Sequence, residues 1–414
     1  MNTLWNKNFI RAIGGMVISA AGGIGLNIAL SVVVFEQTQS TLLTSVFAAL
    51  SMVPNFLLPL IVGPWLDRHN PLKVMLKNES VLAAFFFAAA VFLHFFGFNY
   101  LFMMAFSVIV SCFGVVSQLA SASVIPQIMQ KNDYMRGNAI INIIYPLCAV
   151  VMTPVVMWLF KKYGIALSVG LCAVTSLIDV IIESGIRVEF EFIEKKAEGL
   201  KDYFRDAVEG MRYFKQDIGI RSVFTFVMLM EFAYSSFLLW YPFYNQSPNL
   251  GNGDYALMQS IASLGYLIGG LFHYMVKIPD KRRFQVAVCV YFTFAILDGM
   301  FLLMPFALMC AVRFVLGVFG MNSANIRESA VQARVPNTMR AKLNAFKSMM
   351  VSALGMLGQL AVGALGEKLP FWSIQMGMNV VYLLGILFII LPKKNKVREL
   401  YNYSTDCQSV SAEV

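Results

Sequence analysis

The sequence contains few charged residues. Asp, Glu, Lys and Arg make up 13% of its 414 residues, and hydrophobic residues make up 58%. Soluble domains contain about 25% charged and about 45–50% apolar residues. A soluble fold of this length could not cover so much apolar surface, whereas a lipid bilayer accepts it as solvent. The composition therefore excludes an ordinary soluble protein and predicts an integral membrane protein.

Residues that bind metals or carry redox chemistry are scarce and scattered. The six cysteines show no CxxC or other ligand spacing, and the three histidines match no zinc-site spacing. No P-loop, nucleophile elbow or HExxH motif occurs, so we expect neither an enzyme nor an ATP-driven pump, and no cofactor or metal. The net charge of +9 does not indicate a nucleic-acid-binding protein, because the basic residues form short clusters between apolar runs.

Long apolar runs dominate the remaining sequence. A helix that spans the bilayer needs about 20 predominantly apolar residues. Such runs predict an all-α integral membrane protein with twelve transmembrane helices in two six-helix bundles, at 1–186 and 222–391. A cytoplasmic linker (187–221) joins them, and a cytoplasmic tail (392–414) follows. The predicted spans are 11–35, 42–66, 74–96, 100–125, 138–160, 164–186, 222–245, 255–276, 284–304, 306–328, 342–365 and 371–391.

Basic residues fall mainly on one side of this arrangement. Cytoplasmic loops of membrane proteins carry an excess of Lys and Arg. Of the 32 such residues, only Lys161, Lys162 and Lys368 lie in loops on the opposite side, and Arg313 lies within a span. Arg327, at the end of the tenth run, is counted with the cytoplasmic residues. We therefore predict a multi-pass protein of the cell membrane with both termini and the linker in the cytoplasm.

The two halves are predicted to be repeats joined by an amphipathic helix. Apolar residues recur with helical periodicity across 196–217, which indicates a helix on the cytoplasmic membrane surface, with a solvated connector as the alternative. Met135-Arg136 precedes Asn138-Ala139, and Met339-Arg340 similarly precedes Asn344-Ala345. Related halves predict a binding site between them near the middle of the bilayer.

The loop after the second span reads Gly63-Pro64-Trp65-Leu66-Asp67-Arg68-His69-Asn70-Pro71-Leu72-Lys73. It resembles the signature loop of the major facilitator superfamily. In that loop a glycine is followed by three residues, then by Asp-Arg and further basic residues. Further matches across nearly the whole chain look like the macrolide-efflux branch of drug:proton antiporters. Together with Gly63 and Asp67-Arg68-His69 of the loop, these matches are Thr38-x-Ser40, Pro54, Lys73-x-Met75, Val208-Glu209-Gly210-Met211-x-x-Phe214 and Val335-Pro336.

The resemblance implies a monomeric transporter whose two bundles open alternately to the two sides of the membrane. It implies that Asp67 braces the cytoplasmic side against the start of the eleventh helix near Arg340, a position where the helix dipole favours a carboxylate. Gly63 would allow close backbone approach, and Arg68 would bind carbonyl groups or lipid phosphate. Positive charge on the cytoplasmic side alone would explain Arg68 and Lys73, but not Asp67.

Ionisable residues within the predicted spans are candidates for function, because each costs at least about 2.5–3.5 kcal/mol on insertion scales. Asp298 and Arg313 lie at similar depth on either side of the turn at Pro305, so we expect an ion pair, with substrate contact as the alternative. Glu231 lies deep in the seventh span. A carboxylate that can be charged or neutral suits proton coupling and cation binding, and a hydrogen-bonded structural glutamate is the alternative.

Other polar residues within the spans are candidates for lining a substrate cavity. Contacts between helices are an equally good explanation for any one of them. Asp179 and Glu183, near the end of the sixth span, are expected to reach the membrane interface, and Gly265-x-x-x-Gly269 is expected to be a close-packing site. The cavity candidates are Asn27, Gln118, Asn142, Tyr234, Gln259, Asn322, Asn325 and Gln359.

Three functions fit these observations. The first is proton-coupled efflux of an amphipathic small molecule, with protons, substrate and membrane lipids as the partners. The second is transport of a lipid or metabolite by the same fold. The third is a non-transporting membrane sensor or assembly protein. Two departures from the family pattern bear on proton coupling. Ser111 stands where many relatives have an arginine that is linked to proton coupling, and Thr153-Pro154 replaces a Gly-Pro pair that is typical of antiporters.

Overall fold

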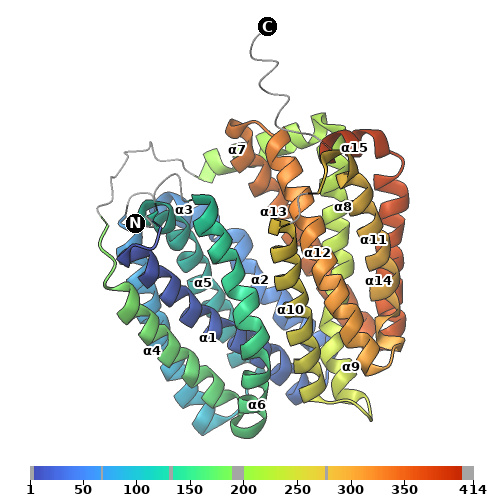
Figure 1. Cartoon of the computed structure of the whole chain (residues 1–414). Helices are drawn as coiled ribbons and strands as arrows, with labels where there is room; N and C mark the ends of the chain where they lie inside the picture. Colours follow the sequence, from blue (N-terminus) through green and yellow to red (C-terminus); the bar gives the residue numbers. More distant parts are fainter. Residues whose placement is uncertain (1–3, 67–68, 130–133, 189–199, 276–277, 403–414) are drawn as a thin grey trace. The chain divides into compact units, whose positions relative to one another are not determined.

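The computed structural model describes residues 4–66, 69–129, 134–188, 200–275 and 278–402. The chain divides into two compact units (Figure 1). Unit 1 comprises Met1–Lys201 and Tyr244–Ser263, and unit 2 comprises Asp202–Phe243 and Leu264–Val414. The first division falls inside the predicted linker 187–221. A short segment from beyond the linker, Tyr244–Ser263, belongs to unit 1.

All regular secondary structure in the described residues is helical. In unit 1 the helices are α1 (Lys7–Thr38), α2 (Thr41–Leu57), α3 (Pro59–Leu66), α4 (Pro71–Phe96), α5 (Tyr100–Ile128) and α6 (Tyr134–Glu183). Two helices run from one unit into the other: α9 (Trp240–Gln246) and α10 (Asn252–Met275). Unit 2 holds nearly all of α7 (Leu200–Gln216), and α8 (Ile218–Tyr234), α11 (Arg283–Met300), α12 (Phe306–Arg334), α13 (Asn337–Gly366), α14 (Phe371–Gly385) and α15 (Lys394–Tyr401).

The helices account for the twelve predicted spans. Ten helical segments in the described residues are long and apolar enough to cross a bilayer. One of these, Ile140–Glu183, turns at Gly164, where a φ of 76° separates the predicted spans 138–160 and 164–186. The shorter apolar helix α2 continues into α3 and corresponds to the predicted span 42–66. The prediction of a twelve-helix membrane protein is confirmed.

Polar caps set several helix starts. The side chains of Asn6, Ser40, Asn70 and Asn99 accept hydrogen bonds from backbone N–H groups in the first turns of α1, α2, α4 and α5. These caps satisfy donors that have no partner within the helix. Asp217 does the same for α8, so the chain turns between the linker helix α7 and the first span of unit 2.

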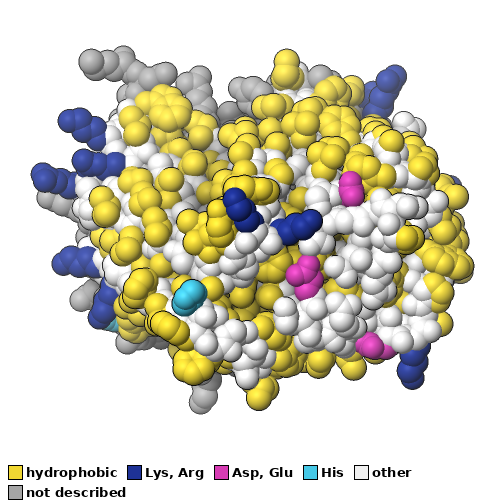
Figure 2. All heavy atoms as spheres, turned by 90° about the horizontal axis from the view of Figure 1, so that it is seen from below, with side chains coloured by type: hydrophobic (Ala, Val, Ile, Leu, Met, Phe, Trp, Pro, Cys, Tyr) yellow, Lys and Arg dark blue, Asp and Glu magenta, His cyan; other side chains and the backbone are white. Residues whose placement is uncertain are grey.

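The surface of both units carries large apolar side chains. Ile181 in unit 1 is 72% exposed and Phe388 in unit 2 is 73% exposed. Figure 2 shows one face on which hydrophobic side chains are widespread and charged side chains are scattered. Exposed apolar area on this scale would be unfavourable in water but matches the hydrocarbon of a bilayer.

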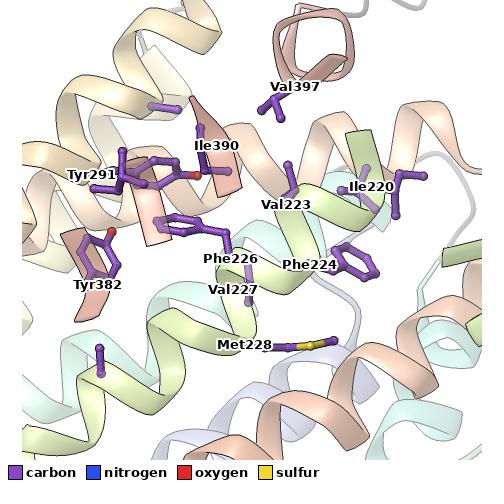
Figure 3. Packing of buried hydrophobic residues seen from close by; sticks show 14 of the residues in the cluster. Ile220, Val223, Phe224, Phe226, Val227, Met228, Tyr291, Tyr382, Ile390 and Val397 are labelled. Carbon is purple, nitrogen blue, oxygen red and sulfur yellow. The ribbon is translucent and has the colours of Figure 1, made fainter. Parts of the chain in front are cut away.

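The core of unit 2 forms around α8. Ile220, Val223 and Phe226 of this helix are fully buried, and they pack toward residues of α11, α14 and α15 (Figure 3). The linker helix α7 is fixed to the start of α13, because a Cβ at Gly210 would overlap the carbonyl oxygen of Lys342 and Lys342 forms an ion pair with Glu209. The amphipathic linker helix is therefore packed on unit 2.

Candidate functional site

Unit 2 contains a cavity of about 260 Å³ between α8, α10, α11, α12 and α14. This volume is slightly below the range of about 300–1,000 Å³ found for small-molecule sites. Its walls are mostly apolar and aromatic, with a few polar and charged groups. The lining residues are Met230, Glu231, Ala233, Tyr234, Tyr266, Val290, Tyr291, Phe294, Asp298, Gly320, Ser323, Ala324, Arg327, Asn379 and Tyr382.

One face of α12 forms a long wall of the cavity. Gly320, Ser323, Ala324 and Arg327 recur at intervals of three and four residues, which places them on the same side of a helix. Three of the four are small, so they leave space beside the helix axis. Arg327 is the exception, and its guanidinium group is the basic group that lines this cavity.

Asp298 and Arg313 meet at the edge of the cavity as a buried ion pair. Nη1 of Arg313 donates to Oδ1 of Asp298 at 3.0 Å, and the two side chains are 3% and 5% exposed. Oδ2 of Asp298 accepts hydrogen bonds from Gln375 at 2.6 Å and from Asn379 at 3.1 Å. The guanidinium of Arg313 also lies 4.1 Å from the ring centre of Trp240. Both charges are thus held by structural partners.

Glu231 lies one turn before a break in its helix. The 3₁₀ segment Ser235–Leu239 follows α8, and Oγ of Ser235 donates to the carbonyl oxygens of Glu231 at 3.2 Å and Gly355 at 3.1 Å. Short 3₁₀ segments within a span often mark a functional hinge. The Glu231 side chain lines the cavity and is partly buried.

Arg327 is the cationic side chain that lines the same cavity as Glu231, whereas Arg313 is paired with Asp298. Arg327 was expected on the cytoplasmic side. In the structure it belongs to α12, is 8% exposed and lines the cavity. The helix continues to Arg334, beyond the predicted end of the span at 328.

Tyrosine rings form much of the aromatic wall. Phe226 packs between Tyr291 and Tyr382, at ring-centre distances of 4.7 and 5.3 Å (Figure 3). The hydroxyl of Tyr291 is hydrogen-bonded to that of Tyr401 at 2.8 Å. Tyr234 of α8 also lines the cavity. The wall therefore combines rigid apolar rings with a small number of hydroxyl groups.

Among the predicted cavity residues, Tyr234 lines this cavity. Asn322 donates to the carbonyl oxygen of Gly269 at 3.1 Å and connects α12 to α10, beside the glycines of the predicted close-packing site. Gln259 donates to the hydroxyl of Tyr255 at 3.2 Å. The remaining candidates lie elsewhere: Asn27, Gln118 and Asn142 are exposed on unit 1, Asn325 is partly buried, and Gln359 is buried in α13.

The signature loop is described only in part. Asp67 and Arg68 lie outside the described residues. A Cβ built on Gly63 would meet no atom within 4 Å. The side chain of Lys73 is exposed, and its backbone N–H donates to the Asn70 cap at 3.1 Å.

Unit 1 contains a group of buried acids that the sequence did not indicate. Asp179 and Glu183 were expected at the membrane interface, but they are 3% and 6% exposed. Both carboxyl groups lie against Gly15 of α1. Glu79 of α4 is 6% exposed and accepts a hydrogen bond from Ser117 at 2.5 Å. Within the described part of the chain, no group of His, Cys, Asp and Glu has the geometry of a metal site.

The family model of the Major Facilitator Superfamily matches residues 12–279. The chain belongs to this superfamily. Its family and fold are those of membrane transporters, not of enzymes, and it is a multi-pass membrane protein. The match confirms the relationship that the loop at 63–73 indicated at superfamily level. No curated protein sequence matches the chain.

Several solved transporter structures have the same fold as this chain. The nucleoside transporter NupG is 15% identical, with a TM-score of 0.70 over 93% of this chain and 99% of that one. A D-xylose-proton symporter is 12% identical, with a TM-score of 0.68 over 94% and 98%. A bacterial homologue of the iron transporter ferroportin is 13% identical, with a TM-score of 0.64 over 96% and 99%. At these identities the likeness concerns the fold alone.

Proposed function

We propose that this protein is a secondary active transporter that exports an amphipathic, drug-like small molecule in exchange for protons. The observation that carries the proposal is the partly buried Glu231 in the wall of an aromatic cavity. The resemblance of its signature loop to the macrolide-efflux branch supports export as the direction of transport. We place the protein in the cell membrane as a monomer, with both termini in the cytoplasm.

Competition at one carboxylate would couple the two fluxes. The charged carboxylate of Glu231 attracts a cationic group on the substrate, and protonation removes that charge. A proton and a cation would therefore bind in alternation, so that release of one accompanies uptake of the other. The tyrosines and Phe294 would hold the apolar body of the substrate through area burial rather than through specific hydrogen bonds.

Two structural devices would support this exchange. The Asp298 carboxylate is bound by Arg313, Gln375 and Asn379, so we assign the Asp298–Arg313 pair to holding α11, α12 and α14 together. Asp67 would stabilise one state of the alternating-access cycle at the cytoplasmic side, as the signature loop implies. The six-helix bundles 1–186 and 222–391 would be the parts that move.

Transport in proteoliposomes tests the proposal. The membrane potential is held at zero with valinomycin and equal potassium on both sides, and a pH gradient that is acid inside is imposed. The substrate probe is tetramethylrhodamine methyl ester, a fluorescent lipophilic cation, and protein-free liposomes give the passive rate. We expect wild type to accumulate the probe until a protonophore is added.

The Glu231→Gln variant should lose this accumulation, and Glu399→Gln serves as its control. Glu399 is about half exposed on α15, and replacing it removes the same charge away from the cavity. Loss of a charged partner typically weakens binding by about 1.5–3 kcal/mol, or about 10- to 150-fold. Absence of transport by well-folded wild type, for this probe and for macrolides, would reject drug efflux and favour a lipid or metabolite substrate.

A further inference from the structure

The same cavity contains a second charged position, on α12, that the exchange at Glu231 does not use. Arg327 is 8% exposed, and its Nε atom is buried without a hydrogen-bond partner among the described residues. Nε of Arg327 lies 4.0 Å from Oε1 of Glu328, which is within range of an ion pair but too long for a hydrogen bond. Both oxygens of Glu328 are instead held by Lys347 at 2.9 Å. Arg327 is hydrogen-bonded to Tyr291, but its buried Nε atom remains available as a donor.

A second unused donor lies on the same face of α12. Ser323 is 3% exposed, lines the cavity, and its Oγ is buried with no hydrogen-bond partner in the described part of the chain. Residues four apart on a helix face have Cβ atoms about 5–6 Å apart. A hydroxyl and a guanidinium at this spacing can donate to the two oxygens of a single carboxylate. Buried polar groups without partners cost free energy, so such a ligand would bind favourably.

The charges of the side chains at the cavity indicate which charged groups a ligand should carry. Asp298 and Arg313 neutralise one another, so the ionisable groups of opposite sign that remain at the cavity are Glu231 and Arg327. A ligand with only a cationic group would leave Arg327 buried and unpaired. A ligand with only an anionic group would do the same to Glu231. A ligand that bears both groups satisfies both side chains and leaves the cavity neutral.

We propose that Arg327 and Ser323 form a carboxylate subsite, and that the substrates are zwitterionic amphipathic molecules with an acid group as well as a basic one. This inference rests on the proposed transport function and narrows its substrate class. Arg suits the role because its planar guanidinium presents several N–H donors in a fixed arrangement that matches a carboxylate. Glu231 would remain the position at which the basic group of the substrate and a proton compete.

A matched pair of fluorescent probes separates this subsite from the transport function. Tetramethylrhodamine carries a carboxylate in addition to its cationic ring system, whereas its methyl ester carries only the cation. Binding of each probe to the purified full-length protein is measured by fluorescence polarisation in detergent. We expect wild type to bind the acid about tenfold or more tightly than the ester, as is typical of a charge-assisted hydrogen bond.

Variants at the subsite should change this preference selectively. Arg327→Gln is expected to lower the ratio of acid affinity to ester affinity to about one. Affinity for the ester should stay the same or rise, because the variant leaves no buried cation unpaired beside it. Arg327→Lys should be intermediate, because lysine keeps the charge but not the Nε donor. Ser323→Ala should weaken binding of the acid only. Arg282→Gln, at an exposed position outside the cavity, is the matched control and should have no effect.

Each outcome is decisive for one of the two proposals. If wild type transports the ester but binds acid and ester equally, or if Arg327→Gln leaves their ratio unchanged, the carboxylate subsite is wrong and the transport function stands. If wild type neither binds nor transports either probe, the drug-efflux function itself fails. If Arg327→Gln does not fold, the acid-to-ester ratios of Arg327→Lys and Ser323→Ala decide, and unchanged ratios in both overturn the subsite.

Discussion

Replacing Asp298 by alanine tests whether its pairing with Arg313 stabilises unit 2. The Asp298 carboxylate accepts hydrogen bonds from Arg313, Gln375 and Asn379, and the two paired side chains are 3% and 5% exposed. Removing one partner of a buried pair costs about 3–5 kcal/mol, because the other charge stays buried and unpaired. Since larger domains lose about 2–4 °C in Tm per kcal/mol, we expect Asp298→Ala to lower the Tm by roughly 6 °C or more.

The double variant Asp298→Ala with Arg313→Met provides the control. Both charges are then absent, and the methionine keeps apolar contact with the ring of Trp240, which lies 4.1 Å from the guanidinium in the wild type. We expect the double variant to recover most of the lost stability. The assay heats the detergent-solubilised protein and measures the monodisperse fraction by size-exclusion chromatography. The reasoning is refuted if the double variant loses as much stability as Asp298→Ala and Arg313→Met lose together when each is made alone. It is also refuted if Asp298→Ala is as stable as wild type.

Three further changes test the packing. Gly265→Ala should cost about 1–3 kcal/mol, because its Cβ would overlap the Phe314 carbonyl oxygen, whereas Gly253→Ala has open space and should be neutral in the same melting assay. Asp179→Asn should raise the Tm, because it removes one negative charge from the buried acids of unit 1, and a fall in Tm would contradict this. Burial raises the pKa of Tyr401 well above its ordinary value of 10.0, so its stabilising contribution is complete below pH 10 and lost at higher pH. Tyr401→Phe should therefore lose about 1 kcal/mol at neutral pH and show a smaller decline in alkaline solution.

Composition and periodicity were sufficient to predict the fold, because the bilayer imposes strong rules on the sequence. Each span must be apolar over about 20 residues, so the runs could be counted directly. The predicted division between the spans 138–160 and 164–186 falls at Gly164, whose φ of 76° interrupts the helix. The predicted starts at 11, 42 and 74 lie within a few residues of the observed starts of α1, α2 and α4, where Asn and Ser caps begin the helices.

The candidate site was only partly predictable. Glu231 and Asp298 could be found because an acid within an apolar run is conspicuous. Arg327 could not, because the run ends nearby and a basic residue at the end of a span reads as a cytoplasmic anchor. The available signal was the spacing of Gly320, Ser323, Ala324 and Arg327, which continues one helix face past the apolar run.

Polar residues gave the weakest predictions, because one sequence does not show which way a helix faces. Asn322 connects two helices through a backbone carbonyl, and Asn27 and Asn142 are exposed on unit 1. All three are asparagines within apolar spans, and nothing local distinguishes their roles. Helix rotation is set by packing against neighbours, as the close approach of Gly265 to Phe314 illustrates.

Proton release on substrate binding tests the central claim, exchange at Glu231, most directly. Purified protein in weakly buffered detergent solution is mixed with tetramethylrhodamine methyl ester while a pH-indicator dye reports proton release. We predict that wild type and Glu399→Gln release protons on binding and that Glu231→Gln binds weakly and releases none. Binding by wild type without proton release, or equal release by Glu231→Gln, would contradict the account.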